Sequence, residues 1–297
     1  MAADLKPLNE QVVVITGASS GIGLCTALLA AERGARVVLA ARSEATLQTV
    51  AAQLVATGSE AIAVTTDVGD RAQLSKLADA AVERFGRIDT WINVAGVAIY
   101  GRLEEVSDED SRRLFDTNFW GVVNGSLCAL PYLRLHGGAL INVGSEVSEA
   151  VVPYQGMYSA SKHAVKGFTD ALRVELEEVE KAPVSITLIQ PTAVNTPYPE
   201  HARNYMAKEP KLPSPMIDPH QVAEAILKTA VEGGRDVKVG AMAVINTATA
   251  KLLPALGDKM SAMQAERQQQ DRPPQAPEGT LFHHGVTGNV YGPGEGT

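Results

Sequence analysis

The stretch Gln11–Gly34, QVVVITGASSGIGLCTALLAAERG, constrains the fold more than any other part of the chain. Its four consecutive apolar residues, Val12–Ile15, predict a strand buried on both faces, because a half-exposed strand would alternate apolar and polar residues. Three glycines follow, and the chain turns directly into a helical pattern. Glycines let backbone N–H groups approach a phosphate, and a helix N-terminus is electropositive. We therefore expect this turn to bind the pyrophosphate of a dinucleotide.

The alternative is a tight strand-to-helix turn that binds no ligand, since a glycine-rich match alone is a weak signal. Here the pattern is T-G-x-x-x-G-x-G, with Gly17, Gly21 and Gly23, rather than the commoner G-x-G-x-x-G. The strand before it and the helix after it favour the nucleotide-binding interpretation.

Composition indicates an ordinary enzyme-like chain, with 45% hydrophobic and 20% charged residues. The net charge of -8 gives no basic surface for nucleic acid. Cys25 and Cys128 lie in different helical patterns without a disulfide framework, which indicates buried thiols of a reducing compartment. The chain shows no secretory signal and no run of roughly 18 apolar residues. We expect a cytoplasmic protein without a membrane span.

Short apolar runs alternate with helical patterns, which predicts a parallel sheet with right-handed crossovers. The predicted strands are residues 12–15, 36–41, 61–66, 88–94, 139–144, 184–190 and 236–240. Ser43, Asp70 and Ser107 are expected to begin helices, and Gly58 and Gly86 to end them. The predicted fold class is α/β: one Rossmann-type domain, with a doubly wound parallel sheet of about seven strands and helices on both faces.

We divide the chain into a catalytic domain, residues 8–245, a helical extension, 246–268, and a flexible tail, 269–297. The segment 191–219 carries seven prolines without periodicity, as lids often do. Glutamine, proline and glycine dominate the tail, so we expect it to be mobile. His283 and His284 lack the cysteine or carboxylate companions of a metal site, and we predict that they are solvated.

The segment YSASK places Tyr158 and Lys162 four residues apart, on one face of a helix. A phenol with a pKa of about 10 exchanges protons poorly at neutral pH, and a neighbouring positive charge lowers that pKa. A surface Tyr–Lys pair is the alternative. Ser145 favours the chemical interpretation, because it ends a predicted strand, where ligands bind in open parallel sheets.

In these features the chain resembles the short-chain dehydrogenase/reductase family. Five elements match in order, over about residues 12–196: TGASSGIG, Asp67, INVAG, Ser145 and YSASK. The resemblance implies that Tyr158 is the general acid or base and that Lys162 lowers its pKa and binds the nicotinamide ribose. Ser145 would orient the substrate oxygen, and Asn118 would hold a water that links Lys162 to solvent.

The resemblance also implies a cofactor site, in which Asp67 contacts adenine, Asn93 and Gly96 lie under its ribose, and Thr196 contacts the carboxamide. The full implied set is Gly17, Ser19, Ser20, Gly21, Ile22, Gly23, Arg42, Asp67, Val68, Asn93, Ala95, Gly96, Tyr158, Lys162, Pro191 and Thr196. Two positions depart from the family pattern: Val94 replaces the second Asn of NNAG, and Thr192 replaces the Gly after Pro191.

NADP(H) is expected in preference to NAD(H). NAD enzymes carry an acidic residue about twenty positions after the glycines, to bind the ribose 2′-hydroxyl. Here Ala41 and Arg42 occupy that place, and a guanidinium can bind a 2′-phosphate. A solvated Arg42 is the alternative.

The expected substrate is an aldehyde, ketone or secondary alcohol with an apolar body. The residues expected to line its pocket are mostly apolar, and any of them could instead belong to the core: Val97, Ile99, Tyr100, Val147, Tyr154, Met157, Val194 and Tyr198. A non-catalytic NADP(H) sensor or scaffold on the same fold is the alternative function. The resemblance further suggests a homodimer or homotetramer packed through the long fourth and fifth helices.

Overall fold

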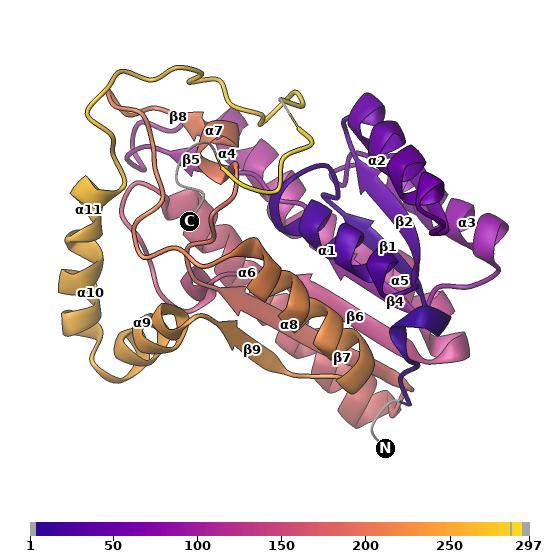
Figure 1. Ribbon diagram of the computed structural model, residues 1–297. Helices are drawn as coiled ribbons and strands as arrows, with labels where there is room; N and C mark the ends of the chain where they lie inside the picture. The colour runs from indigo at the N-terminus through magenta and orange to yellow at the C-terminus, as the bar shows by residue number, and fades with distance from the viewer. Residues whose placement is uncertain (1–3, 286, 293–297) are drawn as a thin grey trace.

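A computed structural model describes residues 4–285 and 287–292, and they form one α/β domain around a parallel sheet (Figure 1). Its spatial order is β3-β2-β1-β4-β6-β7-β9, which confirms the predicted doubly wound sheet of seven strands. The strands are β1 (Val12–Thr16), β2 (Arg36–Ala41), β3 (Ala61–Thr65), β4 (Thr90–Asn93), β6 (Gly138–Val143), β7 (Val184–Pro191) and β9 (Asp236–Val239).

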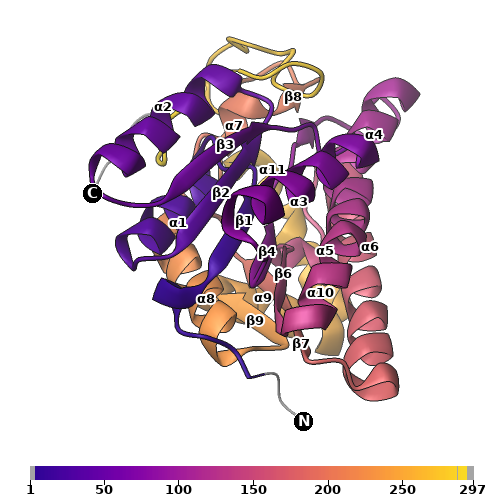
Figure 2. The same cartoon turned by 90° about the vertical axis from the view of Figure 1, so that its right-hand side faces the viewer.

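Helices cover both faces of the sheet (Figure 2). One face carries α1 (Gly21–Glu32), α2 (Glu44–Ala56) and α8 (Pro219–Glu232), and the other carries α3 (Arg71–Phe85), α5 (Gly121–His136) and α6 (Gly156–Arg173). Val13 and Ile15 pack into one apolar cluster and Val12 and Val14 into the other. The continuous apolar run of β1 is thus buried on both faces, as its pattern predicts.

Most predicted helix ends are confirmed. The Asp70 carboxylate accepts from the backbone N–H groups of Ala72 and Gln73 at the start of α3, and Gly86 ends that helix with φ +78°. Ser43 occupies the position before α2, but its hydroxyl donates to Thr46 Oγ1 at 3.0 Å instead of accepting from the helix backbone.

The predicted long helix after Ser107 contains an interruption. It consists of α4 (Asp108–Phe115), a π-helical turn η2 (Asp116–Trp120), and α5. Another π-helical segment, η4 (Val174–Glu180), continues α6. Such turns are frequent at functional sites, and η2 carries Asn118.

The proline-rich segment and the extension contain short elements. In the former, α7 (Tyr198–His201) precedes β8 (Arg203–Asn204), which pairs in parallel with β5 (Ile99–Tyr100). The predicted extension, residues 246–268, contains the end of α9 (Ala241–Leu252), which begins before it, and then α10 (Pro254–Ala262) and α11 (Gln264–Arg267). The break after α9 falls at Pro254, which cannot continue the preceding helix. The 3₁₀ turns η1 (Leu8–Glu10) and η3 (Glu146–Ser148) complete the elements of the described residues. None of these helices is long and apolar enough to cross a membrane.

Residues 269–285 and 287–292, here called the C-terminal strap, are packed against the domain where we predicted a mobile tail (Figure 1). Leu281 is fully buried, and the Thr280 N–H donates to the His201 carbonyl at 2.8 Å. The composition of the strap gave no sign of these long-range contacts. The division into three segments stays a prediction.

Gly279 provides a test of this packing. Its φ is +54°, and a Cβ there would lie 2.4 Å from the Ala202 carbonyl carbon, whereas Gly86, with φ +78°, has nothing within 4 Å. Both Gly→Ala changes cost about 1 kcal/mol of backbone strain. We expect Gly279→Ala to destabilise by a further ~1–3 kcal/mol through the steric clash. Denaturant unfolding of the two variants measures the difference, and equal costs would show that the strap is not packed.

Candidate active site

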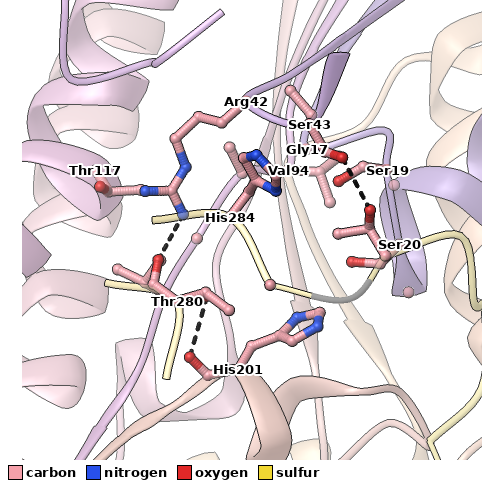
Figure 3. Close-up of a pocket in the computed structure, with 18 of the residues that line it drawn as sticks. Gly17, Ser19, Ser20, Arg42, Ser43, Val94, Thr117, His201, Thr280 and His284 are labelled. Atoms are coloured by element: carbon pink, nitrogen blue, oxygen red, sulfur yellow. Dashed lines mark hydrogen bonds between the residues drawn. The ribbon is translucent and has the colours of Figure 1, made fainter. Parts of the chain in front are cut away.

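Two adjoining cavities lie at the carboxyl ends of the central strands, where the strand order reverses between β1 and β4. The first, of about 190 Å³, lies at the glycine turn and the ends of β2 and β4 (Figure 3). The second, of about 170 Å³, lies at the ends of β6 and β7 beside α6. Ile22, Gly96 and Thr196 line both cavities. A ligand bound in one cavity can therefore reach the other.

The glycine turn is shaped by close backbone contacts. Gly17 has φ +70°, and a Cβ on it would lie 2.8 Å from the Ala95 Cα. A Cβ on Gly23 would lie 2.2 Å from the Gly17 carbonyl oxygen. These contacts place the N-terminus of α1 at the first cavity, next to the INVAG segment. This cradle, which a side chain would fill, fits the pyrophosphate of a dinucleotide.

The structure brings most of the predicted cofactor residues together at the first cavity. They are Gly17, Ser19, Ser20, Gly21, Ile22, Gly23, Arg42, Asp67, Val68, Ala95, Gly96 and Thr196. Pro191 lines the second cavity with Tyr158 and Lys162. Asn93 lines neither: its side chain accepts from Trp91 Nε1 at 2.9 Å and donates to Asn142 Oδ1 at 2.8 Å. Asn93 therefore joins neighbouring strands beneath the site.

Two charged residues at the first cavity already have protein partners. The Asp67 carboxylate pairs with Arg113 at 2.5 Å and accepts from the Gly69 N–H at 2.9 Å. Arg42 donates to the carbonyl oxygen of Thr280 at 2.6 Å (Figure 3) and to that of Leu281 at 3.1 Å. The strap thus fixes the guanidinium of Arg42 at the cavity.

The strap also contributes cavity walls that the sequence did not predict. Thr280, His284, Gly285 and Thr287 line the first cavity. His284 is exposed, as predicted, but Figure 3 shows its ring at the cavity. The strap reaches the glycine turn as well, because the Gly21 N–H donates to the Asn289 carbonyl at 2.9 Å. No local pattern in the tail indicated these contacts.

The second cavity brings Ser145, Tyr158 and Lys162 together. The Ser145 and Tyr198 hydroxyls line the same cavity as the Tyr158 phenol and act to lower its pKa. Lys162 is buried, its Nζ donates to the Val143 carbonyl at 2.8 Å, and it lies 5.7 Å from the centre of the Tyr158 ring. The amine therefore faces the phenol ring and the end of β6.

Burial dominates the electrostatics of this pair. It raises the pKa of Tyr158 to about 12, although the hydrogen bonds of Tyr198 and Ser145 act to lower that pKa. Burial also lowers the pKa of Lys162 to about 8. We predicted a lowered pKa for this phenol, and the net shift is in the opposite direction. The four-residue spacing of Tyr158 and Lys162 indicates that an amine lies near the phenol. It does not indicate that both groups are buried, and their loss of hydration dominates the shifts in pKa.

Asn118 lies behind the cavities, fully buried in η2. Its side chain accepts from the Val97 N–H at 2.8 Å and donates to the Val97 carbonyl and to Ser161 Oγ. A Cβ on Gly96 would lie 3.5 Å from Asn118 Oδ1 and 3.9 Å from Lys162 Nζ. Asn118 and Lys162 therefore approach the same short backbone segment.

The predicted substrate residues divide three ways. Val147 and Val194 line the second cavity, Val97 lines the first, and Tyr198 lines both. Ile99 and Tyr100 are buried in β5, so they belong to the core, and Tyr154 and Met157 line neither of these two cavities. The sequence missed Gln155 and Gln268, buried polar residues that also line the second cavity. Gln268 comes from the far C-terminal part of the chain, where no motif indicated it.

Comparisons with known proteins agree with this geometry. A family model described as short chain dehydrogenase matches residues 11–206. The chain is 45% identical over 273 residues to the uncharacterized oxidoreductase YxnA of Bacillus subtilis (strain 168), covering 91% of this chain and 76% of YxnA.

Two solved structures, each 28% identical to this chain, share the fold. A short-chain dehydrogenase/reductase from Burkholderia phymatum in complex with NAD superposes with a TM-score of 0.72, covering 90% of this chain and 99% of that one. An alcohol dehydrogenase from the archaeon Thermococcus sibiricus, complexed with 5-hydroxy-NADP, gives a TM-score of 0.66 over 77% of this chain and 94% of that one. The chain belongs to the short-chain dehydrogenase/reductase family, and it is an oxidoreductase acting on CH–OH or C=O groups.

Proposed function

We propose that this enzyme is NADP(H)-dependent and transfers a hydride between nicotinamide and a carbonyl or secondary alcohol of a largely apolar substrate. The observation that carries the proposal is the meeting of Ser145, Tyr158 and buried Lys162 beside the glycine-turn cavity. The nicotinamide would supply the hydride. The cradle around Gly17 and Gly23 would hold the pyrophosphate, and Gly96 and Thr196 line the passage between the cavities.

The side chains of the second cavity would handle the oxygen-bound proton. With a pKa of about 12, Tyr158 is protonated at neutral pH, so it can donate to a carbonyl oxygen that gains negative charge. In the oxidative direction it must first ionise, and a positive charge on Lys162 would stabilise the phenolate. Ser145 would orient the substrate oxygen, Lys162 would hold the nicotinamide ribose, and Asn118 would connect Lys162 to solvent.

The preference for NADP(H) rests on Arg42. It lies at the first cavity, just beyond β2, where NAD enzymes place an acidic residue. Two strap carbonyls hold its guanidinium, which restricts the orientations from which it would meet a 2′-phosphate. The nearby Asp67 carboxylate is paired with Arg113, so its negative charge is partly neutralised.

The lining of the second cavity supports an apolar substrate. Its apolar lining includes Val147, Val152, Val194, Leu212 and Pro213. Among the described residues, Lys162 is the only cationic side chain that lines it, so a carboxylate or phosphate on the substrate would have no second positive partner. A further cavity of about 270 Å³ shares Glu146, Val147 and Val152 with it and offers room for a larger substrate.

We also propose a cytoplasmic homo-oligomer. Unpaired thiols at Cys25 and Cys128 support a reducing compartment. Large apolar side chains are exposed on η2, α5 and η4, the helices expected to form the subunit contact; these are Trp120, Leu127, Leu135, Val174 and Val179.

Replacing Tyr158 with Phe tests the proton-transfer role. We expect Tyr158→Phe to lower turnover by at least about 100-fold while NADPH affinity, measured by nucleotide fluorescence, stays largely unchanged. Tyr154→Phe is the matched control, because this half-buried tyrosine lines neither cavity. Substantial turnover by Tyr158→Phe would contradict the role. NADPH binding by the wild-type protein, without oxidation across a broad carbonyl panel, would favour a sensor.

Replacing Arg42 with Ala tests the cofactor preference. We expect Arg42→Ala to weaken NADPH binding by about 10- to 100-fold, since one charge-assisted interaction is lost, and to leave NADH binding nearly unchanged. Arg84→Ala, an exposed change on α3, is the control. Titration of both nucleotides separates two effects: an equal loss for both would mean that Arg42 acts only by holding the strap.

A further inference from the structure

A series of hydrogen bonds leads from Tyr198, whose ring contacts that of Tyr158, to the C-terminal part of the protein. Tyr198 Oη donates to Gln155 Oε1 at 2.8 Å, Gln155 Nε2 donates to Gln268 Oε1 at 2.6 Å, and Gln268 Nε2 donates to the Pro153 carbonyl at 3.0 Å. Gln155 is 5% exposed and Gln268 is 0% exposed. Since water hardly reaches these amides, each bond that was lost would leave a buried polar atom unpaired.

The Pro153 end of this series of hydrogen bonds determines which group donates in each of them. The Pro153 carbonyl can only accept, so the amide nitrogen of Gln268 must face it. The Gln268 oxygen then faces the Gln155 nitrogen, and the Gln155 oxygen faces Tyr198. The Tyr198 proton consequently points toward Gln155, which leaves the lone pairs of its oxygen for Tyr158.

The Tyr158 and Tyr198 rings meet edge to face, with centroids 5.5 Å apart and an interplanar angle of 70°, and the Tyr198 hydroxyl acts to lower the pKa of Tyr158. While both phenols are protonated, the Tyr198 oxygen therefore has its lone pairs, and not its proton, free for Tyr158. Ser145 also acts to lower the pKa of Tyr158, and its Oγ accepts from the Val147 N–H at 3.3 Å.

We propose that Tyr198 is a positioning residue for proton transfer: it holds the Tyr158 proton in place and then donates its own hydrogen bond to the phenolate. This rests on the function proposed above. In reduction the Tyr158 O–H bond breaks, its proton forms a bond to the substrate oxygen, and the electron pair stays on the phenolate. Rotation about the Tyr198 C–O bond turns its hydroxyl from Gln155 to that phenolate without movement of heavy atoms. The Tyr198 proton stays on Tyr198.

Other titratable groups around Tyr158 come from three elements. Lys162 lies one turn along α6, Glu146 follows Ser145 in η3, and Tyr100 in β5 stacks edge to face on Tyr198 at 6.4 Å. Tyr100 provides the control for a test of Tyr198, because its hydroxyl is buried with no hydrogen-bond partner among the described residues. Removal of that hydroxyl therefore breaks no hydrogen bond within the described residues.

The test compares Tyr198→Phe with Tyr100→Phe in the full-length protein, with kcat and KM measured against pH for oxidation of a secondary alcohol by NADP. Oxidation requires ionised Tyr158, so its rate rises with pH. Tyr198→Phe removes a donor to the phenolate, and we expect kcat to fall by about 10- to 100-fold and the midpoint of the pH profile to rise by about one unit or more. Tyr100→Phe should leave that midpoint unchanged.

A second measurement needs no turnover. A fluorotyrosine at position 158, followed by fluorine NMR in the cofactor-free protein, reports ionisation of the phenol directly. Its midpoint should be higher with Tyr198→Phe than with Tyr100→Phe. Equal midpoints in the two backgrounds would overturn the inference even if the proposed function holds. A wild-type protein that oxidises no alcohol would instead count against the proposed function, and the NMR comparison would still decide the role of Tyr198.

Discussion

The close approach of the glycine turn to the segment after β4 is the contact on which the site depends. Gly17 and Gly23 leave no room for a Cβ against Ala95 and the Gly17 carbonyl, and Thr16 Oγ1 accepts from the Val94 N–H at 3.1 Å. The two central strands are thereby fixed where the strand order reverses. Both cavities lie at this point, at the carboxyl ends of the central strands.

Loss of hydration is the main electrostatic effect at the second cavity. Burial disfavours the charged form of each group, so it raises the pKa of Tyr158 and lowers that of Lys162. Hydrogen bonds from Ser145 and Tyr198 counteract part of the effect on Tyr158. The chemistry of the phenol thus depends on directed hydroxyl groups around it as much as on the amine one turn away. Those hydroxyls come from Ser145, which caps η3, and from Tyr198 in α7, so neither lies on the helix that carries Tyr158.

The C-terminal part of the chain completes both cavities. Gln268 closes the hydrogen-bond chain beside Tyr158, and the strap carbonyls of Thr280 and Leu281 hold Arg42. Leu281 packs against Val97 and Leu114, so the strap is anchored by an apolar side chain as well as by backbone bonds. A segment rich in glutamine, proline and glycine can therefore be ordered where the domain supplies its partners.

The sequence alone determined the parallel sheet, the glycine cradle and the grouping of Ser145, Tyr158 and Lys162, because these depend on local patterns: continuous apolar runs, glycine spacing and a four-residue helical repeat. It did not determine the inward direction of Asn93, the pairing of Asp67 with Arg113, or the path of the strap. Only the tertiary structure decided these, and with them the rise in the pKa of Tyr158. Burial and hydrogen bonding between distant residues depend on which surfaces meet, and no periodicity within a segment encodes that.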